Sequence, residues 1–202
     1  MSFSASSETA PTGDEQRRRG RRFTLVILAL CAAPTVAAWL AYFVWPPQSR
    51  TNYGELIKPR ALADPELRRV DGESFRLSQL RGKWVLLQVD SAACDDACRR
   101  KLVVMRQARL ALGKDADRVA RVWLLEGGAM PDPALLREHD GLAVARVSAG
   151  ALLEELPSEG NPSAYIYLVD PRGSLMLRFP GDPDGRRIVR DLVRLLGVSR
   201  IG

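Results

Sequence analysis

Two cysteines, Cys94 and Cys98, have the residue type and spacing best suited to chemistry in this sequence. They lie where an almost continuously apolar run, residues 83–90, gives way to a segment with helical periodicity. The first turn of a helix has free N–H groups and the positive end of the helix dipole, which favour a thiolate. A spacing of four residues puts both sulfurs on one helical face with their Cα atoms about 6 Å apart, so a disulfide is geometrically allowed. An inert structural disulfide is the alternative, but the position at a strand-to-helix junction favours a redox-active pair.

The remaining candidate groups are few. One His and three Cys exclude zinc sites that need several such ligands, and any Ser-His-Asp triad would have to use His139. The carboxylates of Asp95 and Asp96 oppose thiolate formation, and both residue types suit the first turn of a helix. Gln88 lies six residues before Cys94, and its amide cannot relay protons. Asp90 is closer and could do so, although capping the loop is the simpler role.

The elements that must position the cysteines follow from hydrophobic periodicity. Buried strands are predicted over residues 83–90 and 119–125, a hairpin around Asp-Gly in 70–77, and further strands over 143–147, 164–169 and 175–179. Helices are predicted over 97–112, 133–139 and 185–196. In the first of these helices the residues on the buried face are apolar or small, except Lys101. This order predicts an α/β domain.

An apolar segment precedes this domain. Residues 23–45 contain no charged residue, and a helix of that length reaches roughly 34 Å, enough to cross a bilayer core. Five Arg precede the segment and four aromatic residues gather near its far end. Because basic flanks stay in the cytoplasm, we predict a cytoplasmic tail (1–22), a transmembrane helix (23–45), a linker (46–69) and an exported domain (70–202).

Two other fates of the N-terminal segment are open. Val36-Ala37-Ala38 has the small residues of a signal-peptide cleavage site, but the apolar run continues beyond it to Trp45. Cys31 follows a faint lipoprotein motif in which Leu30 is bulky where a small residue is expected. An uncleaved anchor is therefore the prediction.

The charge of the chain does not indicate a nucleic-acid-binding protein. Thirty Lys plus Arg and twenty-four Asp plus Glu give a net charge of +6. Residues 46–202 carry twenty-five basic and twenty-one acidic residues, a difference of four, spread along the sequence. An Arg-rich solvated surface accounts for that balance, so no nucleic-acid partner is predicted.

Residues 71–87, D-G-x-x-F-x-L-S-x-L-R-G-K-W-V-L-L, followed by the cysteines, resemble the thioredoxin-like superfamily. Within it the chain is most similar to the Sco (SenC-type) family of cytochrome c oxidase assembly proteins, which are membrane-anchored thioredoxin folds with a C-x3-C pair. The resemblance covers about residues 60–200 and implies a central mixed sheet flanked by helices, with one N-terminal transmembrane helix. It also implies that Asn161-Pro162-Ser163 is a cis-proline loop that packs against the cysteines and binds substrate. An ordinary strand-start proline is the alternative.

The chain departs from the Sco pattern at two places. Sco proteins carry Pro directly after the first Cys, where this chain has Asp95. The position of their copper-ligand His corresponds to Pro162 in this chain, and proline has no side-chain donor. His139 is no substitute, because we expect it at the surface or at a helix end, at the sheet edge opposite the cysteines.

These observations together predict a thiol–disulfide oxidoreductase of the bacterial periplasm, anchored in the inner membrane. The predicted partners are exported proteins with reducible cysteines, and the resemblance implies a role in cytochrome c oxidase (copper-site) assembly. Cys94 is predicted to attack, Cys98 to resolve the mixed disulfide, and Pro162 to shape the substrate surface. No cofactor is required and no metal site is predicted. Two alternatives stay open: a Sco-like chaperone that holds copper(I) through the two cysteines alone, and a non-catalytic scaffold in an assembly complex.

Overall fold

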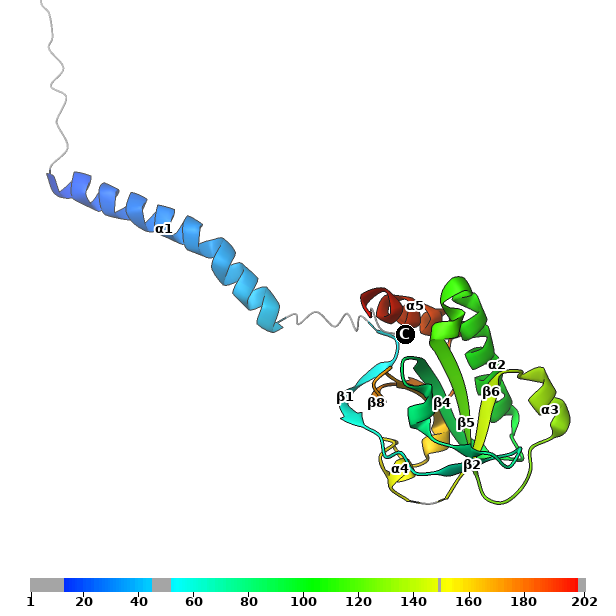
Figure 1. The fold of residues 1–202 in the computed structure, drawn as a ribbon. Helices are drawn as coiled ribbons and strands as arrows, with labels where there is room; N and C mark the ends of the chain where they lie inside the picture. The colour runs from blue at the N-terminus through cyan, green and yellow to red at the C-terminus, as the bar shows by residue number, and fades with distance from the viewer. Residues whose placement is uncertain (1–12, 45–51, 149, 200–202) are drawn as a thin grey trace, which may run out of the picture. The chain divides into compact units, whose positions relative to one another are not determined.

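The computed structural model describes residues 13–44, 52–148 and 150–199, and divides into two compact units, Met1–Arg50 and Thr51–Gly202 (Figure 1). The first unit contains helix α1 (Gly13–Val44), in which Gly20–Leu40 is long and apolar enough to cross a membrane. The hydroxyls of Thr24 and Thr35 donate to backbone carbonyls of the same helix, so neither needs water. Residues 1–12 of the predicted tail, residue 45 of the predicted transmembrane helix and residues 46–51 of the predicted linker lie outside the described residues.

The second unit is built on a mixed sheet with the strand order β1-β8-β7-β4-β5-β6-β2-β3. β4, β5 and β6 are parallel, whereas β7 runs antiparallel to β4, β8 to β7 and β1 to β8. The strands are β1 (Glu55–Ala61), β2 (Leu67–Arg69), β3 (Ser74–Phe75), β4 (Trp84–Ser91), β5 (Val119–Glu126), β6 (Leu142–Val147), β7 (Tyr165–Val169) and β8 (Ser174–Pro180).

Helices connect and cover these strands. They are α2 (Asp96–Ala111), α3 (Pro133–Glu138), α4 (Ala151–Glu154) and α5 (Gly185–Val198), with short 3-10 helices η1 (Leu77–Leu80), η2 (Gly113–Arg118) and η3 (Pro162–Ala164). The predicted α/β domain is confirmed, and so is a mixed sheet flanked by helices.

Strand β4 is buried on both faces, which explains its unbroken apolar sequence. Trp84 and Leu86 pack in a core cluster with residues of α2 and α5. Val85 and Leu87 point the other way, into a cluster that includes Leu152 of α4. The strand is thereby fixed from both sides, and its carboxyl end supplies a rigid start for the segment that carries the cysteines.

The linker prediction for 46–69 is wrong over part of its length, because β1 and β2 lie within it. β1 is an edge strand that pairs with β8 and leaves most of its side chains exposed, so its sequence has no hydrophobic alternation. Pro59 inside it is tolerated because an edge strand has unpaired backbone groups on one side. The predicted hairpin is confirmed by the pairing of β2 with β3, with Gly72 in the left-handed region at φ +93°.

The start of the second unit is fastened to its last helix. The backbone N–H groups of Tyr53 and Gly54 donate to Oδ2 of buried Asp191, at 2.7 and 2.9 Å. The Tyr53 hydroxyl accepts from the N–H of Asp184 at 3.0 Å, and the guanidinium of Arg187 lies 4.2 Å from the Tyr53 ring centroid. Together these contacts hold the entry to β1 against α5.

Candidate functional site

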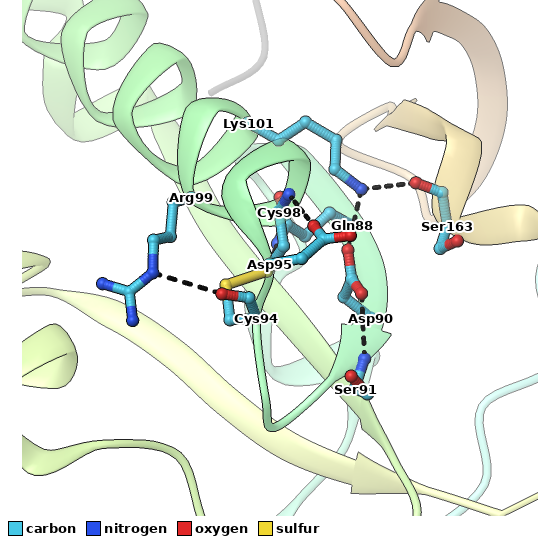
Figure 2. Close-up of a disulfide and its surroundings, with 9 residues drawn as sticks. All are labelled: Gln88, Asp90, Ser91, Cys94, Asp95, Cys98, Arg99, Lys101 and Ser163. Atoms are coloured by element: carbon cyan, nitrogen blue, oxygen red, sulfur yellow. Dashed lines mark hydrogen bonds and ion pairs between the residues drawn. A yellow bond between two sulfur atoms is a disulfide. The ribbon is translucent and has the colours of Figure 1, made fainter.

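Cys94 lies in the turn that leads from β4 into α2, and Cys98 lies in the first turn of α2 (Figure 2). The N–H of Cys94 donates to the carbonyl of Ser91 at 3.2 Å, and Cys94 has a φ of +41°, in the left-handed region. Asp95 then caps α2, since its Oδ1 accepts from the N–H of Cys98 at 2.9 Å. Arg99 Nε donates to the Cys94 carbonyl at 3.2 Å. The predicted helix-start role of Asp95 is confirmed.

A disulfide joins Cys94 and Cys98, with their Cα atoms 5.1 Å apart. Cys94 is 1% exposed and Cys98 is fully buried. They share an apolar cluster with Leu102, Trp123 and Leu135. Attacking cysteines are usually partly exposed. The two cysteines are covered in this structure, which an inert structural disulfide would also show.

Three polar side chains lie beside the disulfide. Gln88 Nε2 donates to Cys98 Sγ at 3.4 Å, and Lys101 Nζ lies 2.9 Å from Asp90 Oδ2. The other oxygen of Asp90 accepts from the N–H of Ser91 at 3.0 Å, so the predicted capping role of Asp90 is combined with an ion pair. Lys101 is the functional candidate that sequence reasoning missed. Its signal was present, as the charged residue on the otherwise apolar or small face of its helix.

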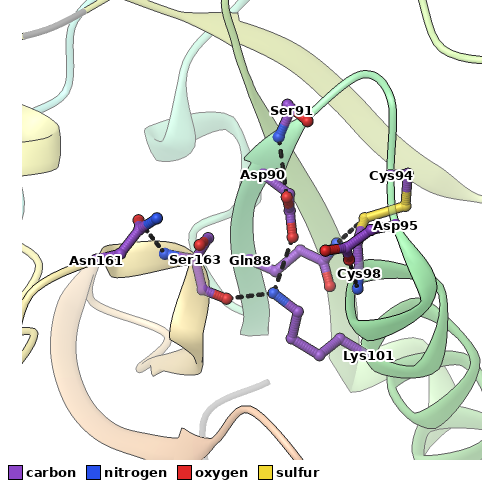
Figure 3. Close-up of polar contacts among 9 residues, drawn as sticks. All are labelled: Gln88, Asp90, Ser91, Cys94, Asp95, Cys98, Lys101, Asn161 and Ser163. Carbon is purple, nitrogen blue, oxygen red and sulfur yellow. Dashed lines mark hydrogen bonds and ion pairs between the residues drawn. A yellow bond between two sulfur atoms is a disulfide. The ribbon is translucent and has the colours of Figure 1, made fainter.

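The loop that contains Pro162 reaches the same place. Lys101 Nζ also donates to the carbonyl of Ser163, which joins this loop to α2 (Figure 3). The cis-proline expectation is wrong, because no peptide bond among the described residues is cis. Pro162 instead opens η3, where its fixed φ suits a helix start, and the Asn161 side chain caps η3 by accepting from the Ser163 N–H at 3.0 Å.

The exit of β8 supports the loop from another side. Gly181 follows β8 and lies against the backbone of Ala164, the last residue of η3. A Cβ on Gly181 would lie 2.4 Å from the Ala164 carbonyl oxygen. The close approach needs glycine at that position, and it places Ala164, the last residue of the loop, against the exit of β8.

His139 lies far from the cysteines. It is the C-cap residue of α3, three residues before Leu142, where β6 begins. Leu142 pairs with Arg121 of β5, and Arg121 pairs with Leu86 of β4. Leu86 is five residues before the end of β4, about 16 Å along the strand. The register therefore places His139 toward the opposite sheet edge, as expected. It is 2% exposed, however, so the surface alternative is wrong. Burial, then the charges of Arg121 and Arg106, lower the pKa of His139.

The donor set around the disulfide does not fit a three-donor copper site. No group of three or more His, Cys, Asp or Glu side chains that could hold a metal occurs in the parts of the chain that the structure describes. After reduction the site offers two sulfurs, from Cys94 and Cys98. The loop side offers Pro162, which has no donor atom, and the Lys101 ammonium, which donates hydrogen bonds.

A family model described as "Transmembrane-like, thioredoxin-like, C-terminal domain" matches residues 84–199, more than half of the chain. In the search of curated proteins, no protein matches this chain.

Solved structures share the fold. Apo Sco1 from Thermus thermophilus is similar with a TM-score of 0.59 and 24% identity, over 73% of this chain and 99% of that one. Copper-bound ScoI from Bradyrhizobium japonicum has a TM-score of 0.52 and 21% identity, over 67% and 99% of the two chains. The thioredoxin domain of a thiol-disulfide oxidoreductase from Bacteroides vulgatus has a TM-score of 0.55 and 18% identity, over 70% and 99%. The predicted thioredoxin-like fold is confirmed, and Sco proteins are among the structures that have it.

Proposed function

Because the chain belongs to the family of transmembrane-like, thioredoxin-like C-terminal domains, we propose that it is a membrane-anchored thiol–disulfide oxidoreductase. The observation that carries this proposal is the disulfide between Cys94 and Cys98 at the junction of β4 and α2. A helix start stabilises a thiolate, and a second sulfur one turn later is close enough to resolve a mixed disulfide. The Pro162 loop beside them is the proposed surface for a client chain.

The proposed reaction starts from the reduced pair, which a dithiol reductant supplies. The Cys94 thiolate attacks one sulfur of a client disulfide, the client S–S bond breaks, and the released client thiolate takes a proton from water. The Cys98 thiolate then attacks Sγ of Cys94, which closes the Cys94–Cys98 disulfide and releases the second client thiolate. Two electrons pass from the cysteine pair to the client. Gln88 donates to Cys98 Sγ, so it is placed to stabilise the Cys98 thiolate, which attacks in the second step.

Trapping of clients tests the proposal in the full chain, solubilised in detergent. Cys98→Ser should accumulate mixed disulfides through Cys94, whereas Cys94→Ser should accumulate none. Both variants carry Cys31→Ser, because Cys31 is a free, exposed thiol. The oxidised Cys31→Ser protein should show no free thiol and should gain two on reduction. If neither variant traps a partner and the oxidised bond resists strong dithiol reductants, the disulfide is structural and the proposal fails.

We place the site in the periplasm of a bacterium, with α1 in the inner membrane, and the clients among exported proteins. The basic flank before the apolar helix supports this orientation. A copper-site subunit of cytochrome c oxidase is the client class that we propose from the shared fold of copper-bound Sco structures. Loss of oxidase activity in a deletion strain, restored by wild-type protein and not by Cys94→Ser, would support that assignment. Normal oxidase activity in the deletion strain would contradict it.

A copper(I) carrier is the second candidate, favoured by the adjacency of two sulfurs that can both become thiolates. The donor set predicts that the reduced protein does not keep Cu(II) in stoichiometric amount through gel filtration. Pro162→His should improve binding, because it supplies an imidazole from the loop. His139→Ala should change neither copper binding nor thiol exchange. Equimolar Cu(II) retained by wild type and lost in His139→Ala would contradict both the ranking of the two functions and the position of His139.

A further inference from the structure

Lys101 is a charged residue in a position made for an apolar one. It lies on the buried face of α2 with Cys98, Leu102, Met105 and Ala108, and it is 1% exposed. An ammonium group taken out of water loses hydration, which only close partners can offset. An apolar side chain would continue the buried face of α2 without this loss of hydration. A lysine at this place therefore calls for a role that an apolar residue cannot fill.

The ammonium connects α2 with the end of β4 and with a loop that lies far along the chain (Figure 3). It starts from α2, one turn after Cys98, and binds Asp90 Oδ2 at the end of β4 at 2.9 Å. It also donates to the carbonyl of Ser163, sixty-two residues later in the chain. The second contact is to backbone, so it holds the path of the loop itself.

The loop needs such a contact. η3 has only three residues, and a 3-10 helix of that length has little stability of its own. The Asn161 side chain caps it locally by accepting from the Ser163 N–H, but this bond does not fix the distance between the loop and the cysteines. Lys101 does so, because it belongs to the helix that contains Cys98.

We propose that Lys101 is a positioning residue for thiol–disulfide exchange: it holds the Asn161–Ala164 loop at a fixed distance from the cysteine pair. A client chain that docks on this loop then presents its sulfur in line with Cys94. This inference rests on the proposed function. Buried ion pairs add little stability compared with apolar replacements, which is why we assign the pair to geometry and not to folding. Small disulfides that do not use the loop should not depend on Lys101.

The test uses the full chain in detergent, with Cys31→Ser in every protein. Lys101→Met keeps the buried stem and removes both contacts. Asp90→Asn removes the charge of the ion-pair partner and keeps the bond from Lys101 to the loop. Arg100→Met is the matched control, because Arg100 is the exposed neighbour of Lys101. The double variant Asp90→Asn with Lys101→Met leaves no unpaired charge, and it replaces the single variant if Lys101→Met does not fold.

Two measurements are made on each protein. Hydrogen exchange follows the amides of Asn161 and of residues 163–165. Stopped-flow kinetics follows reduction of a cysteine-peptide disulfide and of a small aromatic disulfide. In Lys101→Met the loop amides should exchange about tenfold faster, as expected for one lost local hydrogen bond. Peptide-disulfide reduction should slow by about tenfold or more, since displaced reacting groups lose rate steeply. Reduction of the small disulfide should stay within about twofold of wild type. Asp90→Asn and Arg100→Met should keep wild-type loop protection.

Wild-type loop protection in Lys101→Met would overturn the proposal, and so would an equal loss of rate for both disulfides. Equal slowing would place the effect on the cysteines or on the fold. If the wild-type protein reduces neither disulfide, the oxidoreductase proposal itself fails. Hydrogen exchange distinguishes failure of the oxidoreductase proposal from failure of the Lys101 proposal. It reports on the loop whether or not the protein reduces a disulfide.

Discussion

Reduction of the Cys94–Cys98 disulfide should cost the folded protein little stability. The bond closes a loop of five residues, Cys94 through Cys98. The chain-entropy relation for cross-links gives about 2 kcal/mol of stabilisation for a loop of that size at 25 °C. A domain with a typical stability of about 5–15 kcal/mol therefore stays folded when the bond opens. Asp95 and Arg99 hold the same turn by hydrogen bonds that do not depend on the sulfur–sulfur bond.

Urea unfolding of the oxidised and reduced full chain in detergent measures this difference. Near-UV circular dichroism of Trp84 and Trp123, which are both buried, follows the second unit. We expect the free energy of unfolding to fall by about 2 kcal/mol on reduction. The variant with both cysteines replaced by Ser, Cys94→Ser with Cys98→Ser, should show no response to reductant, so it controls for direct effects of the reagent.

A much larger loss would refute this reasoning. If reduction lowers the free energy of unfolding by more than about 4 kcal/mol, or unfolds the protein at 25 °C, the disulfide is a structural cross-link. A pair that must cycle between oxidised and reduced states could not support the fold in that way. The same result would weaken the proposed function.

Three further outcomes follow from the described contacts. Asp95→Ala removes the cap of α2 and should lower the free energy of unfolding by about 1 kcal/mol in urea titrations, whereas Asp96→Ala, which removes no cap bond, should lower it less. Burial lowers the pKa of His139, so the unfolded chain protonates first as the pH falls below about 6.5. Stability should therefore decline from about pH 7 to pH 5, and His139→Phe should reduce that decline in urea midpoints. Gly181→Ala places a methyl group against a loop carbonyl and should destabilise the protein by about 1–3 kcal/mol, while Gly197→Ala, in open space on α5, should have no such cost.

Each of these has a contradicting result. Equal effects of Asp95→Ala and Asp96→Ala would mean that charge, and not the cap, stabilises the helix start. A pH dependence unchanged in His139→Phe would assign it to other groups. A wild-type melting curve for Gly181→Ala would show that the loop can move away from β8 without strain.

The sequence predicts the centre of the fold well because its buried residues form recognisable hydrophobic patterns. β4 is covered on both faces and is apolar throughout its middle, and α2 repeats small or apolar residues at helical spacing. The junction between them therefore has a clear position, and the cysteine pair with it. β1 has no such hydrophobic pattern, since it is an exposed edge strand held by backbone pairing to β8.

The site was predictable only in part, because its contacts depend on segments far apart in the chain. Lys101 is marked by its place on an apolar face, but its partner Ser163 cannot be read from local sequence. The trans bond at Pro162 likewise could not be predicted from the sequence, since both isomers are accessible to a proline. The burial of His139 depends on how α3 packs, and a six-residue helix gives too few positions for a pattern.

The contacts of Tyr53 and Gly54 with Asp191 determine when the second unit can finish folding. In the proposed topology the residues nearest the anchor emerge first, and Asp191 emerges 138 residues after Tyr53. β1 must wait as well, because its partner β8 comes late in the chain. During translocation β1 is therefore an unpaired strand, open to chaperones, proteases and other strands. A chain interrupted before α5 would keep that exposed segment, and quality control in the receiving compartment could recognise it.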